Sequence, residues 1–125
     1  MRKYLIDENT MLAAGNCQTS QAMAIYYNIF EPAERKAAFE QLINLIEEQE
    51  YHLDVGVLGG RVLFHVLTEF GYSDLAFSMI TRPDYPSYGN WIARGATTLW
   101  EVFQPEGSDR IGSLNHHFWG DISSW

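Results

Sequence analysis

The apolar residues of the chain recur at helical spacing, and the alternation typical of strands is nearly absent. From Thr19 to Phe30 apolar residues cover most of the circumference, which predicts a helix surrounded by protein, with Thr19 or Ser20 as its N-cap. A second helix is expected from Pro32 to about Glu50, with an apolar stripe opposite charged residues. The stripe consists of Phe39, Leu42, Ile43 and Ile46.

Shorter elements are predicted toward the C-terminus. A loop is expected around His52 to Gly60. The apolar helix that follows, from Val62 to Phe70, is expected to stop at Gly71, which is a favourable C-cap residue. The next helix is expected to end near Arg82, because Pro83 follows. That helix is expected to start at Ser73 or Asp74. A loop is expected from Asp84 to Gly89, followed by a short helix around Trp91 and a final helix from Ser113 to Trp125. Strand character is expected only at Tyr4 to Ile6.

The sequence therefore predicts an all-α fold in a single domain, residues 1–125. Helical hairpins of this kind build a bundle, an α-solenoid or a closed toroid of inner and outer helices. No repeat of fixed period marks an α-solenoid array. Aromatic residues in the loops, at the same end of successive hairpins, favour the toroid.

Charge and composition exclude several classes of partner. The chain has 16 acidic and 8 basic residues, a formal net charge of −8, which disfavours nucleic acid and anionic membrane surfaces. No apolar run reaches the roughly 18 residues of a membrane span, and the N-terminus lacks the core of a signal peptide. A cytoplasmic location is favoured if Met1 is the natural start. Cys17 is the sole cysteine, and no metal motif is present, so we expect no metal and no cofactor.

Candidate chemistry gathers around the segment GATTLWE, from Gly95 to Glu101. One interpretation is structural, with Glu101 as an acidic residue in the first turn of a helix. The other is functional, with Trp100 and Glu101 at the mouth of a sugar-binding cleft. Most aromatic residues nearby are expected in the core, but loops also display binding groups, and a pyranose offers an apolar face to an aromatic ring. Spacing alone leaves both interpretations open.

Five segments from His52 onward resemble, in order and in spacing, the catalytic barrel of the bacterial α-L-rhamnosidases. These are inverting glycoside hydrolases that fold as a six-hairpin (α/α) toroid. The segment TSQAMAIYYNIF also resembles the preceding inner helix of that family. The five segments are the glycine segment Gly56–Gly60, GYSDLAF at Gly71–Phe77, YPSYG at Tyr85–Gly89, GATTLWE at Gly95–Glu101 and SLNHHFWG at Ser113–Gly120.

The resemblance implies hydrolysis of terminal α-L-rhamnosyl residues, with a rhamnose-containing glycoside as the partner. It implies that Glu101 is the general base, that Trp100 and Tyr88 are aromatic walls of the sugar subsite, and that Asn115 and His116 form a pair whose histidine binds a sugar hydroxyl. The chain departs from the family pattern at three places. Tyr88 stands where the family commonly has tryptophan, and Asp54 stands where it commonly has threonine. Val102–Phe103 stands where the family commonly has Arg-Trp.

An inverting glycosidase also needs a general acid. In the family that acid lies in an upstream acidic motif, which has no counterpart in this chain. We therefore expect a C-terminal part of the barrel that carries only the base and is inactive by itself. Its inner helices, lacking their neighbours, are expected to drive self-association into a homo-oligomer.

Two alternatives remain open at the level of the sequence. The chain could belong to a different inverting glycosidase built on the same toroid, which a substrate panel would distinguish. It could also be a non-catalytic helical module that binds carbohydrate, in which case calorimetry would detect rhamnose binding without hydrolysis.

Overall fold

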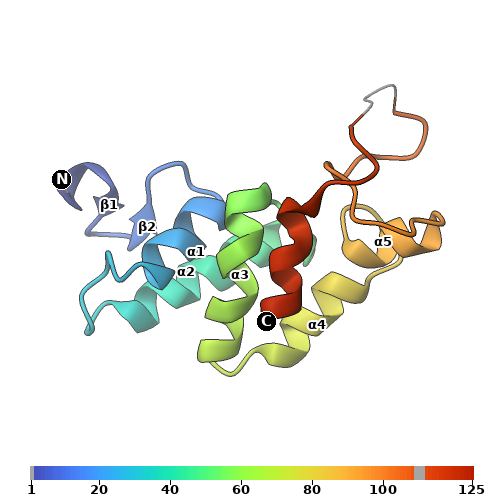
Figure 1. Ribbon diagram of the computed structural model, residues 1–125. Coiled ribbons are helices and arrows are strands. Elements are labelled where there is room, and N and C mark those ends of the chain that lie inside the picture. Colours follow the sequence, from blue (N-terminus) through green and yellow to red (C-terminus); the bar gives the residue numbers. More distant parts are fainter. Residues whose placement is uncertain (1, 109–111) are drawn as a thin grey trace.

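A computed structural model of the chain describes residues 2–108 and 112–125, and it is mostly helical (Figure 1). This confirms the all-α prediction. The α-helices are α1 (Gln18–Tyr26), α2 (Arg35–Glu48), α3 (Val57–Glu69), α4 (Ser73–Thr81) and α5 (Tyr88–Ala93). The 3₁₀ helices η1 (Arg2–Tyr4) and η2 (His117–Ser124) lie near the two ends, and β1 (Ile6–Asp7) pairs antiparallel with β2 (Leu12–Ala13).

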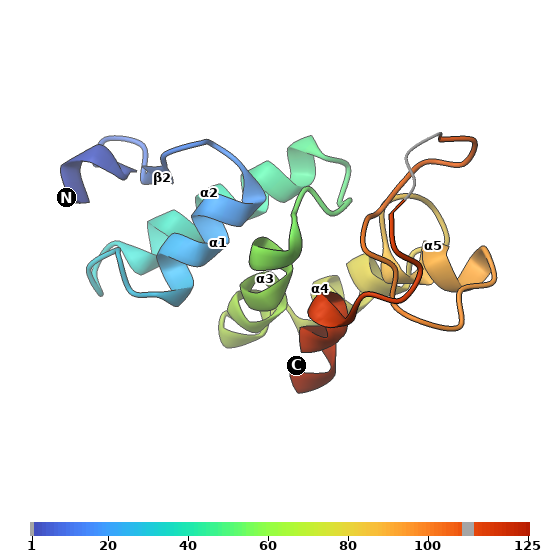
Figure 2. The ribbon, with the colours of Figure 1, turned by 45° about the horizontal axis from the view of Figure 1, so that its top comes forward.

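The helices pack against one another in pairs. Helix α1 packs on α2 and on α3, and α3 in turn packs on α4 and on η2 (Figures 1 and 2). The contacts between these helices are made by fully buried aliphatic side chains, each of which stabilises the fold by roughly 1.5–3 kcal/mol. They include Ile25, Leu42, Ile46, Leu63 and Leu67. The core therefore lies between α1, α2 and α3, and α3 connects it to the C-terminal segments.

Helix α1 differs from its prediction at both ends. It begins at Gln18 after Cys17, which makes no side-chain cap, so the expected cap at Thr19 or Ser20 is wrong. It ends at Tyr26 instead of Phe30, because Asn28 takes a left-handed conformation with φ of 54°. Tyr27 beyond its end is 60% exposed, so the helix is not surrounded by protein there.

Helix α2 begins at Arg35 and not at Pro32, because residues 31–34 form a turn. The N–H of Glu34 donates to the carbonyl of Glu31 at 2.9 Å, and the carboxylate of Glu34 accepts the N–H of Glu31 at 2.8 Å. The predicted stripe faces the core, with Phe39, Leu42 and Ile46 buried and Ile43 partly buried.

Helix α3 begins five residues before the predicted start, so the glycine segment forms its first turns and is not a loop. Gly59 and Gly60 are buried inside the helix. A Cβ at Gly60 would lie 2.7 Å from Cζ3 of Trp119. These glycines therefore serve close packing, which the sequence alone does not distinguish from a turn. After the helix, Gly71 has φ of 84° and ends it as predicted.

The C-terminal elements confirm some boundaries and shift others. Helix α4 matches its prediction within one residue and ends before Pro83. Helix α5 begins at Tyr88, inside the predicted loop, because the Ser87 hydroxyl accepts the N–H of Asn90 at 2.8 Å and caps the helix. The predicted final helix is instead the 3₁₀ helix η2, which begins only at His117. The strand predicted at Tyr4 to Ile6 is observed as β1, which begins at Ile6 and ends at Asp7.

Within the described ranges, no helix is long and apolar enough to cross a membrane.

Exposed apolar side chains are relevant to the expected self-association. Leu58 is 61% exposed, Phe77 is 61% exposed and Ile92 is 73% exposed. Self-association through such residues stays a prediction.

The contact between Gly60 and Trp119 generates a test. Gly60→Ala adds a methyl group where the indole lies, so we expect overpacking to outweigh the gain in helix propensity and to lower the free energy of unfolding by about 1–2 kcal/mol. Chemical denaturation measures this value. Gly120→Ala is the matched control, because its Cβ would meet only Leu99 at an ordinary 3.6 Å. Equal stability of the two variants would contradict the packing role of Gly60.

Candidate active site

A pocket of about 520 Å³ forms where five parts of the chain meet. Residues 53–57, between α2 and α3, line it together with Tyr85 and Pro86 before α5. Residues 101–103 and Trp119 complete the lining, with Cys17 and Thr19 at the start of α1. The pocket holds two carboxylates, Asp54 and Glu101, among apolar and aromatic side chains.

Glu101 is held by hydrogen bonds to both its backbone and its side chain. Its N–H donates to the carbonyl of Ser113 at 2.8 Å, and its Oε2 accepts the N–H of Ser113 at 2.7 Å. Its carbonyl accepts the indole N–H of Trp119 at 2.8 Å. Glu101 thus lies in a non-helical segment whose backbone is hydrogen-bonded to residues 113–116, so its interpretation as a first-turn helix residue is wrong.

An aromatic cluster fixes Trp119, which is 4% exposed. The cluster consists of Tyr88, Trp91, Phe103 and Trp119. The ring centroids of Phe103 and Trp119 are 4.6 Å apart, and those of Trp91 and Phe103 are 4.4 Å apart. The Tyr88 hydroxyl donates to the Trp119 carbonyl at 3.3 Å, and burial raises the pKa of that hydroxyl, so it stays a neutral donor. The cluster therefore orients the indole that holds Glu101.

The two predicted aromatic walls lie next to the pocket and do not line it. Tyr88 is 8% exposed, with its ring packed at 5.3 Å from that of Trp91. Trp100 is partly buried, and the guanidinium carbon of Arg94 lies 5.1 Å from its ring centroid. Neither residue is part of the pocket lining described above. Their roles as sugar-binding walls stay predictions.

The predicted Asn-His pair follows directly from the segment that holds Glu101. Asn115 is exposed, and its N–H donates to the Ser113 hydroxyl at 3.2 Å. The N–H of His116 donates to the carbonyl of Leu99 at 2.8 Å, and its ring packs edge-on against Phe118. Nδ1 of His116 is buried without a hydrogen-bond partner among the described residues. Both binding roles stay predictions.

The structure also brings in residues that the sequence pattern did not single out. Trp119 lines the pocket and anchors Glu101, although its sequence signal was only that of one aromatic residue among several. Asp54 lines the same pocket, and the sequence marked it only as a departure from the family pattern. Within residues 2–108 and 112–125, no group of three or more His, Cys, Asp or Glu side chains could hold a metal ion.

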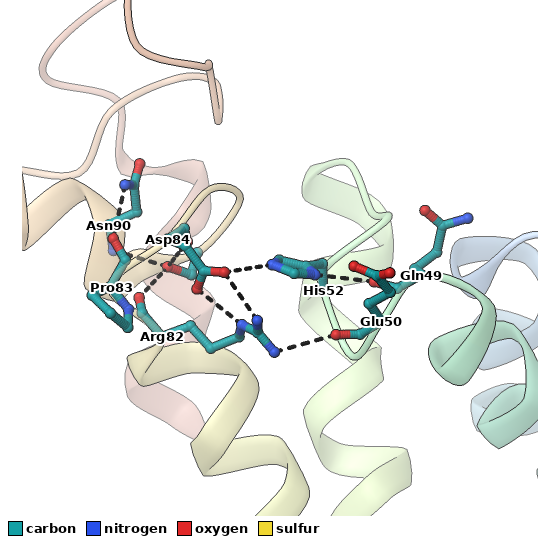
Figure 3. A network of polar contacts seen from close by, with 8 residues as sticks. Gln49, Glu50, His52, Arg82, Pro83, Asp84 and Asn90 are labelled. Carbon is teal, nitrogen blue, oxygen red and sulfur yellow. Dashed lines mark hydrogen bonds and ion pairs between the residues drawn. The ribbon is translucent and has the colours of Figure 1, made fainter.

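A polar network joins two of the loops that line the pocket (Figure 3). Asp84 accepts hydrogen bonds from Nε of Arg82 at 3.0 Å and from Nη2 of Arg82 at 2.9 Å. Nε2 of His52 lies 2.8 Å from Oδ2 of Asp84, and Arg82 also donates to the carbonyl of Glu50 at 3.2 Å. The hydrogen bonds from Arg82 and then His52 lower the pKa of Asp84.

Comparison with known proteins shows extensive similarity. Residues 1–125 match a family model described as the bacterial alpha-L-rhamnosidase 6 hairpin glycosidase domain. The chain is 35% identical over 117 residues to an alpha-L-rhamnosidase of Streptomyces avermitilis, covering 89% of this chain and 11% of that protein. It is 34% identical over 134 residues to an alpha-L-rhamnosidase of Alteromonas sp. (strain LOR), covering 99% of this chain and 14% of that protein.

Solved structures give the same result. A crystal structure of Streptomyces avermitilis alpha-L-rhamnosidase complexed with L-rhamnose matches with a TM-score of 0.91 and 32% identity, covering 99% of this chain and 12% of that one. The alpha-L-rhamnosidase of Dictyoglumus thermophilum matches with a TM-score of 0.86 and 31% identity, covering 99% and 14%. The chain thus spans about 11–14% of the length of these relatives.

The network around Asp84 predicts a stability difference that depends on pH. Its pKa lies below that of an unfolded Asp, about 3.9, so its contribution is present above about pH 4 and is lost as the pH falls further. We expect Asp84→Asn to unfold at a lower temperature than the wild type at pH 6. The difference should shrink as the pH is lowered from about 4 to 2. Calorimetry at these pH values tests this, and a difference that stays constant would contradict it.

Proposed function

Because this chain belongs to the six-hairpin glycosidase domain family of the bacterial α-L-rhamnosidases, we propose that the complete protein hydrolyses terminal α-L-rhamnosyl residues with inversion. The family membership confirms the resemblance seen in the sequence. In this proposal Glu101 is the general base. The related Streptomyces avermitilis enzyme was crystallised with L-rhamnose, which supports a rhamnose-containing glycoside as the substrate.

The observation that carries the proposal is the placement of Glu101 in the pocket. Its carboxylate lines the pocket, and the hydrogen bonds from Ser113 and Trp119 fix its position before a substrate binds. Preorganised groups of this kind need little rearrangement during a reaction. An ionised Glu101 would take a proton from a water molecule, and the oxygen of that water would attack the anomeric carbon as the glycosidic bond breaks.

The leaving oxygen must receive a proton from a second carboxyl group, which in an inverting site stands roughly 6.5–9.5 Å from the base. We propose that this acid comes from a part of the complete protein outside the present chain. This chain would then supply the base and part of the sugar-binding surface. The isolated chain would lack general acid catalysis, which is commonly worth about 100- to 10,000-fold in rate.

The surroundings of Glu101 support the proposed sugar contacts in different ways. His116 is only partly buried, so part of its ring remains available to a sugar hydroxyl, although its Nδ1 is buried. Asn115 presents an exposed amide next to it. Trp100 is only partly buried and retains surface for a sugar ring, whereas the packed ring of Tyr88 would act mainly by supporting Trp119.

Glu101→Gln in the complete protein tests the assignment. Glutamine keeps the shape but cannot take a proton, so we expect kcat for rhamnosides to fall at least about 100-fold while rhamnoside binding persists. Azide should restore some turnover, because it attacks without a base. Steady-state kinetics and calorimetry provide both readouts.

Two controls accompany this test. Glu106→Gln removes the same charge from an exposed residue of the same segment, outside the pocket lining, and should leave kcat unchanged. Trp100→Ala should mainly weaken binding, since a stacking surface serves ground and transition states alike. A Glu101→Gln protein with the wild-type kcat would refute the assignment. If a substrate panel favoured another sugar, the assignment of Glu101 as the base would stand and the proposed substrate would change.

A further inference from the structure

The pocket contains a second carboxylate, Asp54, that the proposed base leaves without a role. Asp54 is exposed and lines the pocket with Glu101. Its carboxylate forms no hydrogen bond or ion pair with any residue of the ranges 2–108 and 112–125. Among the described residues, the lining contains no Lys, Arg or His side chain. The described pocket therefore presents two carboxylates and no compensating cation.

The loop that carries Asp54 is fixed from the side of α1 by Gln18. This side chain is fully buried, and its Nε2 donates to the carbonyl of His52 at 2.8 Å. Its Oε1 accepts the N–H of Asp54 at 3.1 Å. A buried amide is costly unless its polar atoms are paired, so these two hydrogen bonds hold the loop on both sides of Leu53.

The same loop is fixed on its other side by Asp84. Oδ2 of Asp84 contacts the His52 ring, and Arg82 holds both oxygens of Asp84 in its planar fork (Figure 3). Asp84 also directly precedes Tyr85 and Pro86, which line the pocket. The network therefore ties two lining loops together, and Asp84 is the residue that His52 and Arg82 both contact.

We propose that Asp54 is a substrate-binding residue that accepts hydrogen bonds from sugar hydroxyls, and that Asp84 is the positioning residue that holds the Asp54 loop in place. This proposal rests on the proposed function of the pocket. A carboxylate forms charge-assisted hydrogen bonds with hydroxyl groups, and a rigid loop loses little entropy on binding. Two carboxylates, with no cation among the described lining residues, also favour a neutral sugar over an anionic one, such as a uronate.

Asp54→Asn in the complete protein tests the contact with substrate. Loss of the charge should raise KM for a neutral aryl rhamnoside, and the Kd of free L-rhamnose, about 10-fold, with kcat within about 3-fold of the wild type. Asp74→Asn is the matched control, because it removes the same charge from an exposed residue of α4 outside the pocket lining. Unchanged KM and Kd would overturn the role of Asp54. So would a kcat loss larger for an alkyl than for a nitrophenyl rhamnoside, which would make Asp54 the general acid.

A double-mutant cycle tests whether Asp84 acts through Asp54. Asp84→Asn should raise KM about 3- to 10-fold in the wild type but less than about 2-fold in the Asp54→Asn background, because the contact it positions is already weakened. A general loosening of the fold would instead add the same factor in both backgrounds. Equal factors would therefore overturn the positioning role.

A readout without turnover separates this proposal from the proposed function. Amide hydrogen exchange of residues 53–55 should be at least about 10-fold faster in Asp84→Asn than in the wild type, while residues of α2 keep their rates. Unchanged exchange at 53–55 would refute the positioning role even in an active rhamnosidase. Faster exchange in a protein that hydrolyses no rhamnoside would refute the proposed function and keep the positioning role.

Discussion

The candidate site depends on the contact that Trp119 makes with Gly60 on one side and with Glu101 on the other. Trp119 can lie on α3 only because Gly60 has no side chain there. From that position its indole N–H reaches the carbonyl of Glu101 at 2.8 Å. One buried tryptophan thus joins the helical core to the non-helical segment that carries Glu101. A change that displaces this ring would remove one of the hydrogen bonds that hold the candidate base.

The pocket is held together by two different kinds of interaction. The Glu101 segment is fixed by backbone hydrogen bonds to Ser113 and by a buried indole. The loop with Asp54 is fixed by side chains, through buried Gln18 and the partly exposed Asp84 network. Partly exposed ion pairs stabilise proteins weakly, so the Asp84 network is the weaker of the two contacts that hold the Asp54 loop, and buried Gln18 is the stronger. The Glu101 segment and the Asp54 loop are therefore positioned by different contacts.

Sequence reasoning succeeded where the signal was local and periodic. The stripe on α2, the end of α3 at Gly71 and the end of α4 before Pro83 follow from helical spacing and backbone preferences. It failed where a tertiary contact decided the structure. The glycines of α3 predict a loop by their local pattern, but they form a helix that packs on Trp119, about 60 residues away. Ser87 caps α5 and starts it inside the predicted loop. A serine N-cap is a local signal, but the turn residues around Ser87 favour a loop.

The sequence by itself determined the helical class, the family and the carboxylate proposed as base, because periodicity and ordered motifs are properties of the chain. Only the tertiary structure decided which side chains share the pocket. It placed Asp54 and Trp119 beside Glu101, and it placed Tyr88 in the aromatic cluster and Trp100 outside the lining. The physical reason is that such a pocket is assembled from segments far apart in sequence. Their relative positions follow from core packing and long-range hydrogen bonds, which no local pattern encodes.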